Sequence, residues 1–143
     1  MNPIYQKLQG CLKSVREKTD FVPKVAIVLG SGLGDYANDI KVVAEVDYKE
    51  IEGFPVSTVP GHDGRFIFGY VNDVPVVCMK GRVHYYEGYP ISDVVLPTRL
   101  MKMMGAKVLF LTNASGGLIL AGISAVILLL LLIANKWKLP VMM

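Results

Sequence analysis

Apolar residues at the amino terminus recur with the spacing of one helix face. The residues on that face are Ile4, Leu8, Cys11, Leu12 and Val15. A period near 3.6 residues is typical of an amphipathic helix, so the pattern predicts a helix that ends near Thr19. We expect this helix to serve packing.

Short continuous apolar runs predict the strands. Residues 24–30 (KVAIVLG) and 107–112 (KVLFLT) have the unbroken apolarity of buried strands in a parallel or mixed sheet. Between them, the runs RFIFGYV and VPVVCMK flank Asn72 and Asp73, which are residues suited to a tight turn. The segment 65–80 is therefore predicted to be a β-hairpin.

A second helical pattern covers residues 91–106 (ISDVVLPTRLMKMMGA). Ser92 or Asp93 is the candidate amino-terminal cap, and Gly105 is the stop signal. Pro97 either opens the regular helix or kinks it. Strands that alternate with helices predict an α/β domain.

The pattern changes abruptly after Asp93, because the last fifty residues contain no acidic side chain. Residues 118–134 (LILAGISAVILLLLLIA) are uncharged, and 17 residues lie at the short limit for spanning a bilayer. Lys136, Trp137 and Lys138 would form an interfacial flank. Two interpretations stay open: a membrane anchor, or an apolar tail on a domain whose upstream pattern is that of a soluble protein.

Length and composition narrow the function classes. A chain of 143 residues suits one domain, and 15 basic against 12 acidic residues give a net charge of +3. The basic residues are scattered, which argues against nucleic-acid binding. Cys11 and Cys78 are too far apart for a CxxC motif, so we expect neither a metal site nor a disulfide framework. Charged residues interrupt the amino terminus, so no signal peptide is predicted and the expected location is cytoplasmic.

A glycine-rich turn, Gly30–Gly34, directly follows the first predicted strand. Glycines allow a sharp turn whose N–H groups converge on an anion, and Ser31 adds a hydroxyl donor. The GxGxG spacing matches neither the dinucleotide fingerprint nor the P-loop. Read alone, the turn either binds an anion or merely connects two elements.

Three further segments carry polar chemistry. His62 lies in the glycine-flanked loop VPGHDGRF and is either a ligand contact or a solvated loop residue. In GRVHYYEGYP (residues 81–90), Arg82 and His84 would share one face of an extended segment and suit phosphate, the alternative being a solvated loop with an aromatic plug. The stretch TNASGG (residues 112–117) ends a strand, where ligands of open α/β sheets bind.

The ordered motifs LGSGLG, VPGH, GRVHYYEGYP and TNASGG, between about Val25 and Gly117, resemble the trimeric class of purine nucleoside phosphorylases. The resemblance implies a mixed β-sheet with flanking helices. It also implies a ribose contact by Tyr86 and a catalytic role for His84. The residues that it assigns to phosphate are Ser31, His62, Arg82, His84 and, through its main-chain N–H, Ala114.

The implied reaction is reversible phosphorolysis of a purine nucleoside to the free base and ribose 1-phosphate, a step of purine salvage. Inorganic phosphate is the co-substrate, and neither a metal nor an organic cofactor is implied. The implied partners are a purine nucleoside, phosphate and two further copies of the chain in a homotrimer.

The chain departs from the family after Gly117. Family members are considerably longer, and the resemblance places their base-recognising Glu and Asn in the part that has no counterpart here. We therefore interpret residues 1–117 as the first part of a phosphorylase domain and 118–143 as an unrelated apolar tail. A reading-frame change or truncation near Leu118 would explain the switch.

This departure leaves two functional interpretations. The first is a purine nucleoside phosphorylase with an incomplete fold, an uncertain trimer and impaired turnover. The second is a non-catalytic remnant whose tail, through residues 118–134, associates with a membrane or with other proteins.

Overall fold

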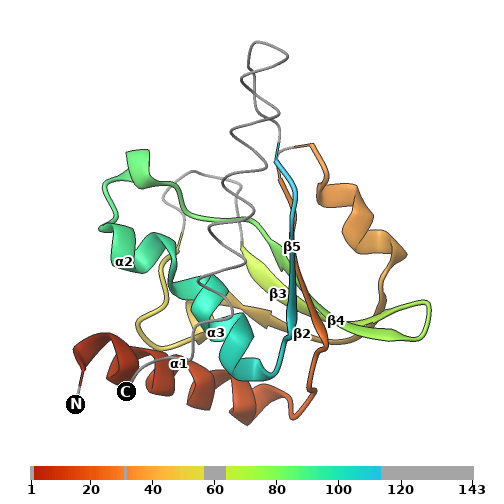
Figure 1. Cartoon of the computed structure of the whole chain (residues 1–143), viewed down its shortest axis with the longest axis horizontal. Helices are drawn as coiled ribbons and strands as arrows, with labels where there is room; N and C mark the ends of the chain where they lie inside the picture. The colour runs from red at the N-terminus through yellow and green to blue at the C-terminus, as the bar shows by residue number, and fades with distance from the viewer. Residues whose placement is uncertain (1, 31, 57–63, 114–143) are drawn as a thin grey trace.

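The computed structural model describes residues 2–30, 32–56 and 64–113 (Figure 1). Every predicted helix and strand has a counterpart, whereas the strand at residues 41–47 and the three 3-10 helices of the described ranges were not predicted. In chain order the elements are α1 (Pro3–Lys18), β1 (Val25–Val28), the 3-10 helix η1 (Gly34–Asp39), β2 (Lys41–Asp47), η2 (Tyr48–Glu50), β3 (Arg65–Val71), β4 (Val74–Lys80), η3 (Tyr85–Glu87), α2 (Ile91–Val94), α3 (Leu96–Met104) and β5 (Val108–Leu111).

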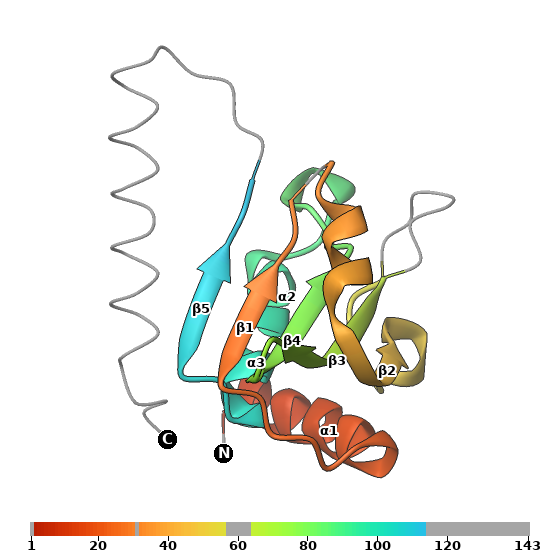
Figure 2. The same ribbon diagram turned by 90° about the vertical axis from the view of Figure 1, so that its right-hand side faces the viewer.

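The strands form one mixed sheet in the order β2-β3-β4-β1-β5 (Figure 2). Strand β1 is parallel to both β4 and β5, whereas β2, β3 and β4 pair antiparallel. The expected α/β fold with a mixed sheet is confirmed. Because β4, β1 and β5 run in the same direction, their carboxyl ends meet at one edge of the sheet.

Helices α1 and α3 lie side by side and cover one face of the sheet (Figure 1). The main core forms between them and the strands, with Phe66 and Phe68 of β3 and Leu100 and Met101 of α3 all fully buried. A smaller cluster fills the other face, where Ile27, Ile67 and Cys78 pack under η1. The loops that follow the carboxyl ends of the strands therefore rest on a sheet with an apolar cluster on each face.

The boundaries and caps of the two predicted helices agree with the structure only in part. Helix α1 ends at Lys18 with Thr19 as its cap, as expected. The second helical segment is split, and Pro97 lies in the first turn of α3, which confirms that it opens a helix. The predicted cap was wrong: Pro90 occupies the cap position of α2, and Asp93 instead accepts a 2.8 Å hydrogen bond from Lys7 Nζ.

Strand β5 was predicted to be buried, and this was wrong. Leu109 and Leu111 are half-buried on the helix side, but Val108 and Phe110 are 54% and 59% exposed on the other side. In the described sheet β5 is an edge strand, and η1 covers only the strands further from this edge. A continuous apolar run does not reveal which face of a strand lacks a cover.

Within the three described ranges, no helix is long and apolar enough to cross a membrane. The candidate span 118–134 and the whole tail 118–143 lie outside these ranges.

Candidate functional site

Three segments meet at the carboxyl ends of the parallel strands. Gly30 follows β1 and Thr112 follows β5, while Gly81 follows β4. The Thr112 side chain ties two of them together: Gly30 N donates to Thr112 Oγ1 at 2.9 Å, and Thr112 Oγ1 donates to Val28 O at 2.9 Å. The glycine-rich turn is thus fixed against the last strand by a hydroxyl group.

The contact between these two segments is too close for a side chain at position 30. A Cβ atom on Gly30 would lie 2.7 Å from Asn113 Cα and 2.7 Å from Thr112 O. Gly32 then has φ +82°, in the left-handed region that glycine adopts without strain. Both glycines are required by the path of the backbone, which brings the turn directly beside Asn113.

The loop after β4 presents its polar side chains together. Gly81 directly follows β4, and its φ of +81° turns the chain away from the strand. Val83, two residues later, is buried. Arg82 and His84 on either side of Val83 are only half-buried. This alternation is typical of an extended segment, in which residues two apart share a face. That Arg82 and His84 face a common ligand stays a prediction.

Arg82 makes no hydrogen bond or ion pair with any residue in the described part of the chain. His84 is held by its neighbours: its main-chain N donates to Glu87 Oε1 at 2.8 Å, and its ring stacks on Tyr86 at 4.8 Å between centroids. Tyr86 itself is 80% exposed. The loop therefore offers a guanidinium, an imidazole and a phenol to a ligand.

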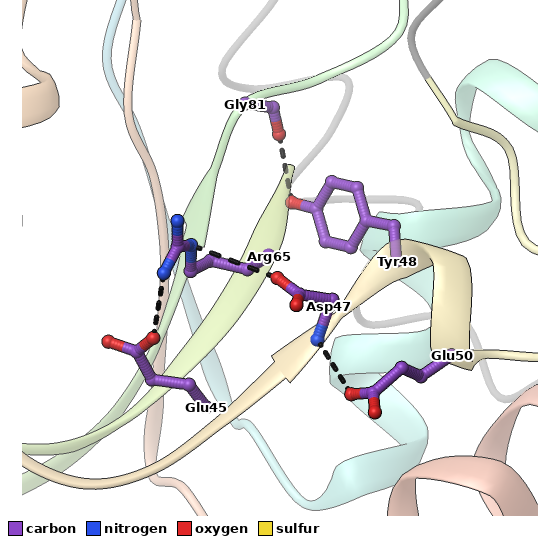
Figure 3. Close-up of polar contacts among 6 residues, drawn as sticks. All are labelled: Glu45, Asp47, Tyr48, Glu50, Arg65 and Gly81. Atoms are coloured by element: carbon purple, nitrogen blue, oxygen red, sulfur yellow. Dashed lines mark hydrogen bonds and ion pairs between the residues drawn. The ribbon is translucent and has the colours of Figure 1, made fainter. Parts of the chain in front are cut away.

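Tyr48 anchors this loop from below. Its hydroxyl donates to Gly81 O at 2.8 Å (Figure 3). Burial raises the pKa of Tyr48 well above its ordinary value, so the hydroxyl stays protonated and remains a donor. Sequence reasoning missed this residue, because nothing in the local pattern at position 48 connects it to position 81.

Gly64 completes the same contact. A Cβ atom on Gly64 would lie 2.2 Å from the Tyr48 ring, and one on Gly81 would lie 3.1 Å from Gly64 Cα. The end of the segment that carries His62 therefore lies against the start of the segment that carries Arg82. The glycine at the end of VPGHDG is the one signal in this loop that could have indicated the close approach.

Of the predicted site residues, the structure places Arg82, His84 and Tyr86 in one loop. Ser31, His62 and Ala114 lie outside the described residues. Their described neighbours Gly30, Gly64 and Asn113 lie at the same edge of the sheet. The structure thus brings together the four segments that carry the predicted residues, without describing three of the side chains.

Other chemistries find no support in the described residues. No group of three or more His, Cys, Asp or Glu in those ranges is arranged to hold a metal ion. Burial raises the pKa of Cys78 to about 11 and also raises that of Cys11, so both remain thiols. Neither cysteine has the thiolate character that a nucleophile needs.

A protein-family model described as the phosphorylase superfamily matches residues 24–125. Two curated relatives are purine nucleoside phosphorylases: that of Anopheles gambiae is 49% identical over 113 residues, and that of Bos taurus is 45% identical over 114 residues. The matches cover 79% and 80% of this chain but only 32% and 39% of those proteins. The chain therefore spans about a third to two-fifths of the length of these relatives.

Solved structures show the same relation. The purine nucleoside phosphorylase from Schistosoma mansoni in complex with acetate superposes with a TM-score of 0.75 at 40% identity, over 81% of this chain and 43% of that one. A purine nucleoside phosphorylase in complex with ribose-1-phosphate gives 0.70 at 40% identity, over 78% and 41%. These matches confirm the resemblance to purine nucleoside phosphorylases that the four ordered motifs indicated, and the chain belongs to the phosphorylase superfamily.

Proposed function

We propose that this chain binds inorganic phosphate where β1, β4 and β5 end, and that it acts in purine nucleoside phosphorolysis. The observation that carries the proposal is Arg82: this half-buried residue has no hydrogen-bond or ion-pair partner in the described part of the chain and stands two positions before His84 in the same loop. A cation placed in this way suits an anionic ligand, because a guanidinium presents paired donors that match phosphate oxygens.

The geometry of the loops supports the following roles. Arg82 binds two phosphate oxygens, and His84 donates a further hydrogen bond while Glu87 holds its backbone. The glycine-rich turn adds main-chain N–H groups, since a turn of this kind forms an anion-binding concavity. Ser31, His62 and the main-chain N–H of Ala114 complete the proposed phosphate site.

Tyr86 is the proposed ribose contact. Its exposed ring already lies parallel to the His84 ring, with an angle of 9° between the two planes. A sugar that rests against Tyr86 is therefore within reach of the phosphate that His84 holds. This arrangement orders the two substrates along one loop.

The proposed reaction begins with attack of a phosphate oxygen on the anomeric carbon of the nucleoside. The bond to the purine breaks as the new C–O bond forms, giving ribose 1-phosphate and the base. The phosphate dianion stabilises the developing positive charge on the sugar, so the protein contributes placement and charge complementarity. Solved relatives in complex with inosine and with ribose-1-phosphate support this substrate class. We place the activity in cytoplasmic purine salvage.

A second candidate function is association with other molecules without catalysis. Val108 and Phe110 favour it, because both apolar side chains are more than half exposed on the edge strand of the described sheet. Surfaces of this kind mark contacts with proteins or membranes. In this version the phosphate site is retained from the family, and the apolar segments bind the partner.

Arg82→Ala tests the phosphate site. We expect this change to weaken phosphate binding by about 1.5–3 kcal/mol, the contribution of hydrogen bonds to a charged partner. Calorimetric titration of the full chain with phosphate measures the effect. Arg99→Ala is the matched control, since Arg99 is an exposed arginine on α3. Equal phosphate affinity in the wild type and Arg82→Ala would remove the site.

A further inference from the structure

Lys80 is the last residue of β4 and lies two positions before Arg82. Its side chain is half-buried, and its Cε is 3.9 Å from the position that a Cβ atom would take on Gly34. Gly34 is the last glycine of the glycine-rich turn. Lys80 therefore reaches from one proposed phosphate-binding segment to another, although neither the resemblance nor the motifs assigned it a role.

The Lys80 side chain lines a cavity of about 410 Å³ between η1 and strands β2, β3 and β4. The cavity wall is apolar at Ile40 and Ile67, and it carries charge at Arg65, Glu45 and Lys80. A volume of this size accommodates a small anion with its water shell. Lys80 thus lines this cavity and also approaches Gly34, the last glycine of the glycine-rich turn.

The other charges of the cavity compensate one another. Arg65 Nη1 lies 2.9 Å from Glu45 Oε2, and Arg65 Nε lies 3.9 Å from Asp47 Oδ1 (Figure 3). The Asp47 side chain is 56% exposed, so solvent screens its charge. Lys80, in contrast, forms no hydrogen bond or ion pair across residues 2–30, 32–56 and 64–113. Among the described residues, Lys80 is therefore the charged residue of the cavity without an ion-pair partner.

We propose that Lys80 attracts phosphate electrostatically and strengthens its binding at the neighbouring site. This inference rests on the proposed function, and it adds a residue that acts on the anion through its field without touching it. A half-buried charge interacts over several ångströms more strongly than one in bulk water, because the surrounding protein lowers the local dielectric. A cavity with low-dielectric walls also concentrates the field of a charge that lines it.

The test is calorimetric titration of the full chain with inorganic phosphate at several salt concentrations. Lys80→Gln keeps most of the apolar stem and removes the charge, and we expect it to weaken binding about threefold to tenfold at low salt. The dependence of affinity on salt should become shallower as well. Lys80→Arg, which restores the charge, should bind phosphate almost as well as the wild type.

Lys41→Gln is the matched control. Lys41 is an exposed lysine in β2 that pairs with Tyr70, near the far end of β3. Lys80 pairs with Arg65, at the opposite end of β3. The Lys41→Gln substitution therefore removes the same charge far from the site and should leave phosphate affinity unchanged.

Each outcome is decisive. If Lys80→Gln binds phosphate with the affinity and salt dependence of the wild type, the inference is wrong and the proposed function stands. If Lys80→Arg binds as weakly as Lys80→Gln, the effect comes from packing and the electrostatic inference is again wrong. If the wild type itself binds no phosphate, both the inference and the proposed function fail.

Discussion

Replacement of Gly30 by alanine is expected to lower the free energy of unfolding by about 3 kcal/mol, the upper range for inserting an atom into a packed site. The added Cβ would lie 2.7 Å from two backbone atoms, Asn113 Cα and Thr112 O. Backbone cannot move aside as the end of a side chain can. The hydrogen bond from Gly30 N to Thr112 Oγ1 should be lost as well. Urea unfolding followed by circular dichroism measures the change.

Gly10→Ala is the control for this prediction. Gly10 lies inside α1, and a Cβ there would meet no atom within 4 Å. The same substitution should therefore stabilise the chain by roughly 0.5–1 kcal/mol, because alanine favours the helix over glycine. If the two variants had equal stability, the close packing of the glycine-rich turn against Asn113 would be contradicted.

Turnover of inosine by the 143-residue chain is expected to be about a hundredfold to a thousandfold slower than that of a full-length relative. A purine leaves readily only when a proton or hydrogen bond meets its developing negative charge. The resemblance assigns that task to an acid and an amide that have no counterpart in this sequence. Placement of phosphate by Arg82 and His84 cannot supply this stabilisation.

Release of hypoxanthine, coupled to uric-acid formation, measures this turnover with and without phosphate. The Bos taurus enzyme, assayed beside it, provides the reference rate. Phosphate-dependent release at the rate of that enzyme would contradict the prediction. Complete absence of release, with phosphate binding intact, would favour the non-catalytic alternative.

Elements with a strong local pattern were predictable. Helix α1 follows from its apolar period, and the hairpin follows from Asn72 and Asp73 between two apolar runs. Asn72 indeed has φ +51°, which a tight turn of this kind needs. In both cases the residues that specify the element are neighbours in the chain.

Elements that depend on distant partners were not predictable. Strand β2 has only one buried side chain, Val46, so its sequence shows no clear inside and outside. It is fixed by pairing with β3, which includes a bulge between Val42 and Ala44. The exposed face of β5 escaped prediction for the same reason, since burial depends on what else covers the sheet.

The candidate site contains features that depend on neighbouring residues and features that depend on distant ones. The candidate pair Arg82 and His84 could be proposed from the sequence, because spacing within one extended segment determines which side chains share a face. The contact of Tyr48 with Gly81 could not be predicted, and neither could the lack of an ion-pair partner for Lys80 among the described residues, because each depends on residues that are distant in the chain. Glycines mark such contacts in the structure: Gly30 and Gly64 both occur where two backbone segments, or a backbone and a ring, approach closely.

A phosphate site at the carboxyl ends of β1, β4 and β5 can be tested by titrating the ¹⁵N-labelled full chain with inorganic phosphate and following the amide NMR shifts. We expect the largest shifts on Gly30, Gly32, Arg82 and His84, and we expect them to saturate together with one dissociation constant. Shifts that are absent, or that are scattered over α1 and the far end of the hairpin without saturating, would contradict this expectation.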